Sequence, residues 1–228
     1  MGKGKLIDLT KCIGCRGCQV ACKQWHNLPS ESTSYNKEFT NPQNRSAYTW
    51  TLIEFQTTEY EGKPAYTFTK TSCLHCEEPA CQSVCIAGAI KKQESGAVTI
   101  DADKCIGCRY CQVGCPFHVP KYEYDKWFPK MLKCNLCNDR ITAGLKPACA
   151  TTCPTGAITF GEREELLTLA KERIAKGGEK YINHIYGEHE AGGTAVMYLS
   201  GVPLELTALN PNVTTEAERA TTEHDQGN

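Results

Sequence analysis

The sequence predicts an α+β fold in which one cysteine-bearing unit occurs twice, and three observations support this prediction. All sixteen cysteines of the 228-residue chain fall into four runs of four. Residues 7–22 (IDLTKCIGCRGCQVAC) and 100–115 (IDADKCIGCRYCQVGC) are identical at twelve of sixteen positions, which indicates an internal duplication. Short β-prone segments flank the later runs, and an amphipathic helical pattern follows the last one.

The spacing within the cysteine runs points to one kind of cofactor. Runs one and three have the C-x2-C-x2-C-x3-C spacing of bacterial ferredoxins, and runs three and four end in Cys-Pro. Three cysteines in such a loop reach three irons of one cubane, while the fourth ligates the neighbouring cluster. The pattern therefore predicts four 4Fe–4S clusters in a duplicated, bacterial-ferredoxin-like protein that transfers electrons. The predicted iron ligands are Cys12, Cys15, Cys18 and Cys22; Cys73, Cys76, Cys81 and Cys85; Cys105, Cys108, Cys111 and Cys115; and Cys134, Cys137, Cys149 and Cys153.

Two other cysteine chemistries fit the sequence less well. An even number of cysteines is compatible with disulfides, but the chain is not a small scaffold and residues 1–8 lack an apolar signal core. Paired C-x2-C motifs also form zinc sites. Zinc, however, does not require a third cysteine at x2 or a fourth at x3 with proline after it. We therefore favour iron–sulfur clusters over disulfides and zinc.

Runs two and four are also related to each other. Residues 79–81 and 147–149 both read PAC, and residues 85–90 (CIAGAI) correspond to 153–158 (CPTGAI). The two runs differ mainly between their second and third cysteines, which are separated by four residues in run two and eleven in run four. The ancestral unit is then a two-cluster ferredoxin. The duplication alone leaves open whether run one shares its clusters with run two or with run four.

An insertion separates runs one and two. Residues 26–46 are rich in Asn, Ser, Pro and Thr, which is typical of a surface loop. Residues 48–55 and 64–69 are β-prone, and the turn residues 61–63 lie between them. We therefore expect residues 26–70 to form an inserted loop followed by a β-hairpin.

Short strands are expected beside the later runs, at residues 97–100 and 157–160. An amphipathic helix is predicted for residues 162–174, because acidic residues begin it and basic residues follow. Gly177 and Gly178 end the helical pattern.

A strand is predicted at residues 194–199, so that residues 161–207 form a C-terminal extension of one helix and one strand. From residue 208 the sequence is polar and weakly patterned. Residues 208–228 are accordingly predicted to be a disordered tail.

Composition excludes some partners. A net charge of −1 gives no electrostatic case for binding nucleic acid. The hydrophobic content of 40% is modest, and covalently held clusters can replace part of a core because metal binding contributes folding free energy. No apolar run reaches ~18 residues, so the sequence predicts no transmembrane segment.

Several charged and aromatic residues lie close to the cysteines in sequence. The cations have two interpretations: they raise the reduction potentials of nearby clusters, or they are solvated surface charges, as most such residues are. The histidines are expected to be structural or solvent-facing, because each run already supplies four ligands. The tryptophans are expected to serve packing or an interface. These residues are Lys11, Arg16, Lys104, Arg109 and Lys133; His75 and His118; and Trp25, Trp50 and Trp127.

The four runs, in this order and with these spacings, resemble the four-cluster iron–sulfur subunits of molybdopterin oxidoreductases. The resemblance covers residues 5–160. Within that group, residues 18–26 (CQVACKQWH) and 180–199 (KYINHIYGEHEAGGTAVMYL) are similar to the iron–sulfur (β) electron-transfer subunits of formate dehydrogenases. The sequence therefore identifies a candidate member of the formate dehydrogenase branch.

The resemblance implies how the cysteines are shared. It pairs runs one and four in one ferredoxin-like lobe, formed by residues 1–25 and 126–160, and runs two and three in another, formed by residues 71–125. The implied ligand sets are Cys12, Cys15, Cys18 with Cys153; Cys134, Cys137, Cys149 with Cys22; Cys73, Cys76, Cys81 with Cys115; and Cys105, Cys108, Cys111 with Cys85.

The resemblance also implies a function and partners. The chain would be a non-catalytic subunit of an oxidoreductase complex of anaerobic respiration. It would conduct electrons between a large molybdopterin subunit with molybdenum or tungsten, which oxidises formate or reduces carbon dioxide, and a cytochrome, a quinone-linked subunit or a soluble acceptor. Two alternatives remain open. The partner could be a polysulfide, thiosulfate or dimethyl sulfoxide reductase-type subunit, or the chain could be a free multi-cluster ferredoxin.

One feature departs from the membrane-bound members of the family, whose β subunits carry a C-terminal transmembrane helix. No long apolar segment follows Leu206, so we do not expect this chain to anchor a complex in the membrane. No targeting signal is evident in the sequence. Co-export with a partner that carries a twin-arginine signal would place the chain in the periplasm, and the cytoplasm is the alternative.

Overall fold

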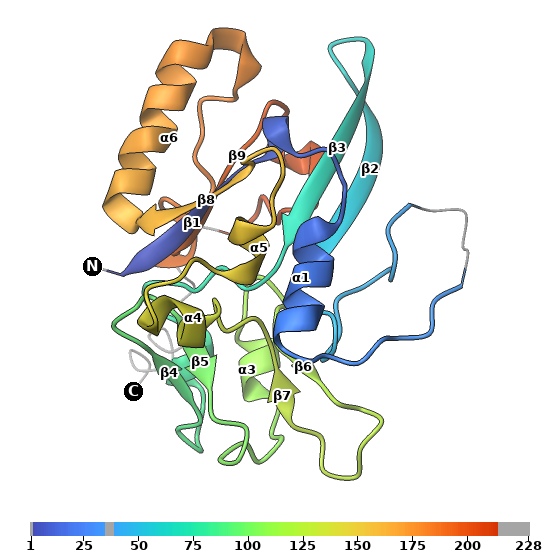
Figure 1. The fold of residues 1–228 in the computed structure, drawn as a ribbon, viewed down its shortest axis with the longest axis vertical. Helices are drawn as coiled ribbons and strands as arrows, with labels where there is room; N and C mark the ends of the chain where they lie inside the picture. The colour runs from blue at the N-terminus through green and yellow to red at the C-terminus, as the bar shows by residue number, and fades with distance from the viewer. Residues whose placement is uncertain (1, 35–38, 214–228) are drawn as a thin grey trace, which may run out of the picture.

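The computed structural model describes residues 2–34 and 39–213 (Figure 1). Its largest sheet has β1 (Lys3–Asp8) in the centre, antiparallel to β8 (Ile158–Glu162) and parallel to β9 (Val196–Leu199). Helix α6 (Arg163–Gly177) lies along one face of this sheet (Figure 1). The core between them consists of Leu6, Leu166, Leu167, Ala170, Tyr181, Ile185, Met197 and Leu199.

Strand β1 is a central strand that the sequence analysis did not predict. Its sequence, KGKLID, contains a glycine and two lysines, which are residues of low strand propensity. Gly4 is required there, because a Cβ atom on it would lie 2.2 Å from the carbonyl oxygen of Ala195. The strand is thus fixed by close backbone packing against its neighbours and not by its local propensity.

The predicted β-hairpin is present as β2 (Leu52–Tyr60) and β3 (Lys63–Thr71). Tyr60 pairs with Lys63, so the turn consists of two residues, Glu61 and Gly62, with φ values of +52° and +71°. Positive φ at both positions matches the right-handed twist of the two strands.

The first strand begins later than predicted. Residues 48 and 49 do not extend it, because their backbone N–H groups bond to the hydroxyl of Ser46, at 3.0 and 2.9 Å. A serine side chain here replaces the ladder with a local turn. The described residues of the predicted loop, 26–34 and 39–46, contain neither helix nor strand.

Two pairs of short elements bring the cysteine runs together two by two. Helix α1 (Gly17–Trp25) of run one contacts α5 (Ala148–Thr151) of run four, and α2 (Ala80–Ser83) of run two contacts α3 (Tyr110–Val113) of run three. The strands follow the same scheme. β8 pairs with β1, and β5 (Val98–Ile100) pairs with β4 (Ile90–Lys92).

The repeat is visible in the backbone as well as in the sequence. In every run, the residue before the second cysteine lies in the left-handed region. The four φ values are +66° at Gly14, +54° at His75, +72° at Gly107 and +60° at Leu136. Two runs supply glycine for this conformation, whereas His75 and Leu136 adopt it with a side chain. The turn that points successive cysteines toward a common space is therefore the same in all four runs.

The extra residues of run four form a helix of their own. Helix α4 (Asn138–Thr142) lies between Cys137 and Cys149, which accounts for the eleven-residue spacing there. The remaining elements are β6 (Lys121–Tyr122) and β7 (Met131–Leu132), which pair, and four short 3-10 turns at Leu9–Lys11, Gly178–Lys180, Glu190–Gly192 and Leu204–Leu206. Throughout the described ranges, no helix combines the length and apolarity that crossing a bilayer demands.

The C-terminal extension differs from the prediction at three places. Helix α6 continues to Gly177, three residues beyond the predicted end. Strand β9 starts at Val196 and not at residue 194, because Thr194 bridges to Cys76 of run two. Residues 208–213, predicted as part of a disordered tail, pack against the molecule with Leu209 only 7% exposed. The rest of that predicted tail, 214–228, lies outside the described residues.

Tertiary contacts account for the packing of residues 208–213. The N–H of Ala208 bonds to the Thr69 hydroxyl of β3 at 3.3 Å, and the Tyr186 hydroxyl donates to the Asn210 carbonyl at 2.9 Å. The sequence shows no apolar periodicity here because two buried side chains, Leu209 and Val213, and a few hydrogen bonds are sufficient to hold the segment.

Candidate iron–sulfur centres

Two cavities are each lined by four cysteine thiols. The first lies between runs one and four, and Lys70 and Ile7 also line it. The second lies between runs two and three, with Tyr122 in its wall. In each cavity, three thiols belong to one run and the fourth to another run. The first cavity contains Cys12, Cys15, Cys18 and Cys153; the second contains Cys85, Cys105, Cys108 and Cys111.

The pKa shifts of the remaining thiols indicate a third group. Burial raises the pKa of the Cys22 thiol to about 12, and the neighbouring Cys134 and Cys149 contribute to the rise. Burial also raises the pKa of Cys137 to about 11, with the same two cysteines adding to it. Cys22 of run one therefore lies near Cys134 and Cys149 of run four, and these two also lie near Cys137.

The fourth group joins runs two and three. Burial raises the pKa of the Cys76 thiol well above its ordinary value, and the neighbouring Cys73, Cys115 and Cys81 raise it further. Burial likewise raises the pKa of Cys81 to about 12, and Cys73 and Cys115 add to it. Cys115 of run three thus faces three cysteines of run two.

These groups fit the predicted cofactor. Four thiols around one cavity match the four cysteine ligands of a cubane. Thiols with raised pKa values keep their protons at neutral pH, so iron binding must displace those protons. In the chain as described, residues 2–34 and 39–213, no three Cys, His, Asp or Glu side chains converge closely enough to hold a single metal ion.

Several sulfur atoms have a hydrogen-bonding neighbour. Such bonds stabilise the thiolate and are one of the means by which a protein raises a cluster's reduction potential. The Tyr122 hydroxyl is the donor once its cysteine is a thiolate. The contacts are Tyr122 Oη with Cys111 Sγ at 3.2 Å, His26 Nε2 with Cys137 Sγ at 3.4 Å, Ala89 N with Cys85 Sγ at 3.3 Å, and Leu136 N with Cys134 Sγ at 3.4 Å.

Three lysines are buried among the cysteine runs. Lys5, Lys70 and Lys133 are 0%, 1% and 3% exposed. The sequence analysis considered Lys133 but missed Lys5 and Lys70, because neither is adjacent to a cysteine. A correct strand assignment would have revealed Lys5. Side chains alternate along a strand, so Lys5 shares a face with Ile7, which lines the first cavity, while Leu6 faces α6.

The other predicted cations divide into two kinds. Lys104 and Arg109 are exposed, which agrees with their interpretation as solvated charges. Lys11 and Arg16 are half-buried, and Lys133 is buried, so that interpretation is wrong for Lys133. The contacts are Lys11 Nζ with Asp8 at 3.9 Å, Lys104 Nζ with Asp101 at 3.1 Å, Arg16 over the Phe55 ring at 4.8 Å, and Arg109 over the Tyr124 ring at 5.3 Å.

His75 is a buried structural residue. Its side chain is fully buried, and its Nδ1 accepts a hydrogen bond from the N–H of Val98 at 2.9 Å. Burial and the nearby positive charges of Lys133 and Lys5 hold its pKa well below the ordinary value, so the ring is neutral. His118 is exposed. The two histidines thus match the two expected roles, since His75 is structural and His118 faces solvent.

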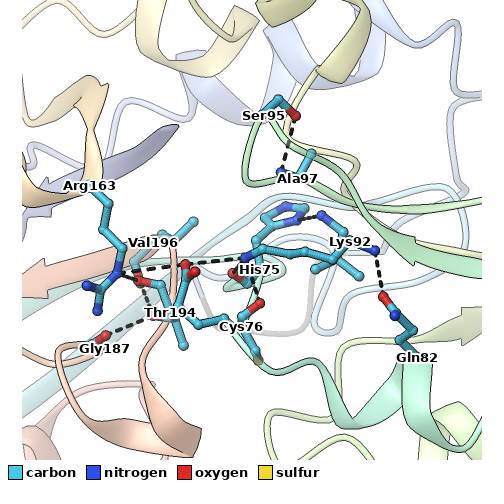
Figure 2. Close-up of polar contacts among 12 residues, drawn as sticks. His75, Cys76, Gln82, Lys92, Ser95, Ala97, Arg163, Gly187, Thr194 and Val196 are labelled. Carbon is cyan, nitrogen blue, oxygen red and sulfur yellow. Dashed lines mark hydrogen bonds and ion pairs between the residues drawn. The ribbon is translucent and has the colours of Figure 1, made fainter. Parts of the chain in front are cut away.

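The C-terminal extension supports the loop of run two (Figure 2). The N–H of Ala195 donates to the carbonyl of His75 at 3.1 Å. Arg163 of α6 holds this segment by donating to the Thr194 carbonyl at 3.0 Å. From the other side, the Lys92 ammonium donates to the carbonyl of Cys76 at 2.8 Å and to that of His75 at 3.3 Å. The extension therefore takes part in forming a cysteine loop.

The three tryptophans lie in different surroundings. Trp25 donates from Nε1 to the carboxylate of Asp139 at 2.8 Å, and the guanidinium of Arg140 lies 4.2 Å from its ring centre. Trp50 stacks near His26, with ring centres 4.8 Å apart. Trp127 is 90% exposed. Trp50 also packs against the buried core, as expected, whereas Trp25 is 44% exposed.

Comparison with protein families gives two matches, each described as a 4Fe-4S dicluster domain. One match covers residues 11–89 and the other covers residues 64–163. Two dicluster matches together with sixteen cysteines identify a duplicated ferredoxin-like protein that binds four 4Fe–4S clusters.

Similar proteins cover most of this chain. It is 43% identical over 198 residues to the iron-sulfur subunit of the nitrate-inducible formate dehydrogenase of Escherichia coli K12, which covers 86% of this chain and 67% of the relative. It is 41% identical over 199 residues to the formate dehydrogenase iron-sulfur subunit of Haemophilus influenzae, covering 86% and 63%. It is 38% identical over 233 residues to the hydrogenase-2 operon protein HybA of Escherichia coli O157:H7, covering 89% and 71%. The chain spans between 58% and 71% of the lengths of such relatives.

Proposed function

This chain belongs to the family of 4Fe–4S iron–sulfur subunits of the formate dehydrogenase type, and from that membership we propose that it conducts electrons to or from a formate-oxidising partner. The partner is a large subunit with a molybdenum or tungsten pterin, and the acceptor is a cytochrome, a quinone-linked subunit or a soluble carrier. The observation that carries the proposal is the grouping of sixteen thiols into four sets of four within one fold.

We propose the same division of ligands that the sequence resemblance implied. It is supported by the two thiol-lined cavities and by the mutual effects of the remaining thiols. Each set contains three cysteines of one run and one of another, and it is named after that single cysteine. The C153 set is Cys12, Cys15, Cys18 and Cys153; the C22 set is Cys134, Cys137, Cys149 and Cys22; the C115 set is Cys73, Cys76, Cys81 and Cys115; and the C85 set is Cys105, Cys108, Cys111 and Cys85.

The domain division belongs to the same proposal. The C153 and C22 sets form one lobe from residues 1–25 and 126–160, and the other two sets form a second lobe from residues 71–125. Contacts between α1 and α5 and between α2 and α3 support this division. Residues 26–70 are then the insertion, and residues 161–207 are the extension that supports run two.

The reaction of the complex sets what this chain must do. Oxidation of formate gives carbon dioxide, one proton and two electrons, and the reverse reaction consumes them. The 4Fe–4S clusters, when bound, supply one-electron chemistry. The residues of this chain hold the sulfur ligands, exclude water from the buried thiols and set the local charge. The chain itself makes and breaks no bond of the substrate.

A second candidate partner is a hydrogenase subunit. The similarity to HybA, whose name refers to a hydrogenase-2 operon, favours this candidate specifically. Both partners place the same demand on this chain, which is to transfer electrons one at a time. The source of the electrons therefore has to be decided by experiment.

We also propose that the complex works in the periplasm, exported together with a partner that carries a twin-arginine signal. The proposal extends the family resemblance of the sequence to the compartment. Activity in a periplasmic fraction of the native host, with a twin-arginine segment on the large subunit, is the expected result. Activity confined to the cytoplasmic fraction would contradict it.

The first experiment uses the native complex, purified without oxygen. Formate is added, and reduction is followed by low-temperature electron paramagnetic resonance (EPR). We expect signals of more than one reduced 4Fe–4S centre within the turnover time. If hydrogen gives these signals and formate does not, the partner is a hydrogenase. If only dithionite gives them, both donors are rejected and a sulfur-compound or sulfoxide reductase becomes the partner.

A further inference from the structure

Two lysines are buried without a carboxylate partner between the proposed centres of the first lobe. Lys5 comes from β1 and Lys70 from β3, and they are 0% and 1% exposed. Among the described residues, their ammonium groups meet the Cys149 sulfur at 3.8 Å and the Ser72 hydroxyl at 3.1 Å, and no Asp or Glu. A buried ammonium is strongly destabilising unless an anion compensates it. The compensating anions must therefore be something other than carboxylates.

The group nearest to Lys5 is a proposed cluster ligand. Its ammonium group lies 3.8 Å from the sulfur of Cys149, which belongs to the C22 set. The negative charge that compensates Lys5 is therefore that of the C22 centre and its thiolate ligands.

Lys70 lies beside the other set of this lobe. It lines the cavity of the C153 set, and its side chain is 1% exposed. Its ammonium group therefore acts on the C153 centre, whereas Lys5 acts on the C22 centre.

The C85 set has different surroundings. Among the described residues that line its cavity there is no lysine or arginine, and the polar group in the wall is the hydroxyl of Tyr122. The lysine next to this set in sequence, Lys104, is 57% exposed and paired with Asp101. Water screens such a charge, whereas the low-dielectric interior around Lys5 and Lys70 does not.

We propose that Lys5 and Lys70 are fixed positive charges that raise the reduction potentials of the C153 and C22 centres above that of the C85 centre. A reduced cluster carries one more negative charge than the oxidised one, so a buried cation stabilises the reduced form more. Lys70, which lines the cavity of the C153 set, raises the potential of that centre, and Lys5, which contacts Cys149, raises that of the C22 centre. The inference rests on the proposed ligand sets but not on formate as the donor.

The test is an EPR-monitored redox titration of the whole complex with Lys5→Met and Lys70→Met, poised by chemical mediators without formate. For Lys70→Met, we expect one midpoint potential to fall by at least a tenfold change in the reduction equilibrium constant, which is about 59 mV for one electron. For Lys5→Met, we expect the potential of a different centre to fall. The other centres keep their potentials.

Matched variants separate charge from packing. Lys104→Met removes a lysine that adjoins a ligand but is exposed, and we expect it to leave all four potentials unchanged. Lys5→Gln and Lys70→Gln keep a polar group and remove the charge, so they must reproduce the Met shifts. Iron and sulfide content, together with EPR spin counts, establishes that each variant holds four clusters.

Three results would overturn the proposal. Unchanged potentials in the Lys70 variants would show that the charge of Lys70 does not set the potential of a cluster. An equal shift in Lys104→Met would show that burial is irrelevant. If Lys5→Met and Lys70→Met shifted the potential of the same centre, the two lysines would not act on separate sets. None of these results depends on whether formate reduces the complex.

Discussion

At the scale of single residues, the proposed ligand sets assign the fourth cysteine of each run to a different set from the first three. In run one, Cys18 and Cys22 both lie in α1, four residues apart, so they share one face of the helix about 6 Å apart along its axis. Cys18 lines the cavity of the C153 set, while Cys22 faces Cys134 and Cys149. One helical turn therefore connects two centres and fixes their separation.

Replacing these two cysteines separately tests the proposed sets. Cys22→Ala should alter the EPR signal of a centre whose other ligands belong to run four, while Cys18→Ala should alter a different signal. In each variant, three unchanged 4Fe–4S signals should remain. The centre lost in Cys22→Ala should also be the one whose potential responds to Lys5→Met. Loss of the same signal in both cysteine variants would mean that run one ligates a single cluster.

At the scale of elements, an ionic contact attaches α6 to the central strand. The carboxylate of Asp8, at the end of β1, is fully buried. It accepts hydrogen bonds from Tyr181 at 2.9 Å and from Arg173 of α6 at 3.2 Å. Since Arg163, at the other end of the helix, holds the segment that supports run two, α6 links the sheet to a cysteine loop.

Removing that carboxylate should loosen the helix. Asp8→Ala leaves Arg173 and Tyr181 without their acceptor, so we expect the free energy of local opening of α6 to fall by about 3 kcal/mol. Amide hydrogen exchange of the native complex measures this quantity. As a control, Glu172→Ala removes an exposed i,i+4 pair with Lys176 on the same helix and should change it by about 0.5 kcal/mol or less. Equal effects of the two variants would show that Asp8 does not hold α6.

At the scale of the whole molecule, the cysteines are unevenly distributed among the cores. The core between α6 and the three-stranded sheet contains no cysteine, whereas the other two cores include buried cysteines of the runs. Metal binding contributes folding free energy where ligands are part of the core. The molecule therefore consists of a part that folds by apolar packing and a part that depends on its clusters.

Cluster removal should expose this difference. After oxidative destruction of the clusters and chelation of iron, we expect amide protection to persist in α6, β1 and β9 and to be lost around the four runs. Hydrogen exchange read by mass spectrometry gives protection segment by segment. Loss of protection throughout the chain would show that the clusters also hold the apolar core, and protection retained at the runs would show that they hold neither part.

The sequence by itself determined the cofactor chemistry and the duplication, because both depend on local spacing. Four cysteines at fixed intervals and a repeated sixteen-residue segment can be recognised without any knowledge of the fold. The hairpin and α6 were also predictable, since turn residues and helical periodicity are local signals. Their ends shifted where another contact competed, which was a local turn at Ser46 and a tertiary bridge at Thr194.

Only the tertiary structure decided which charges are buried and what lies against the cysteines. Lys5 and Lys70 approach cysteines that are far away in the sequence, such as Cys149 in the case of Lys5. β1 has a sequence of low strand propensity and is fixed by its neighbours, and residues 208–213 are held by contacts with β3 and Tyr186. Burial and long-range electrostatics arise only when distant segments meet, so local patterns do not reveal them.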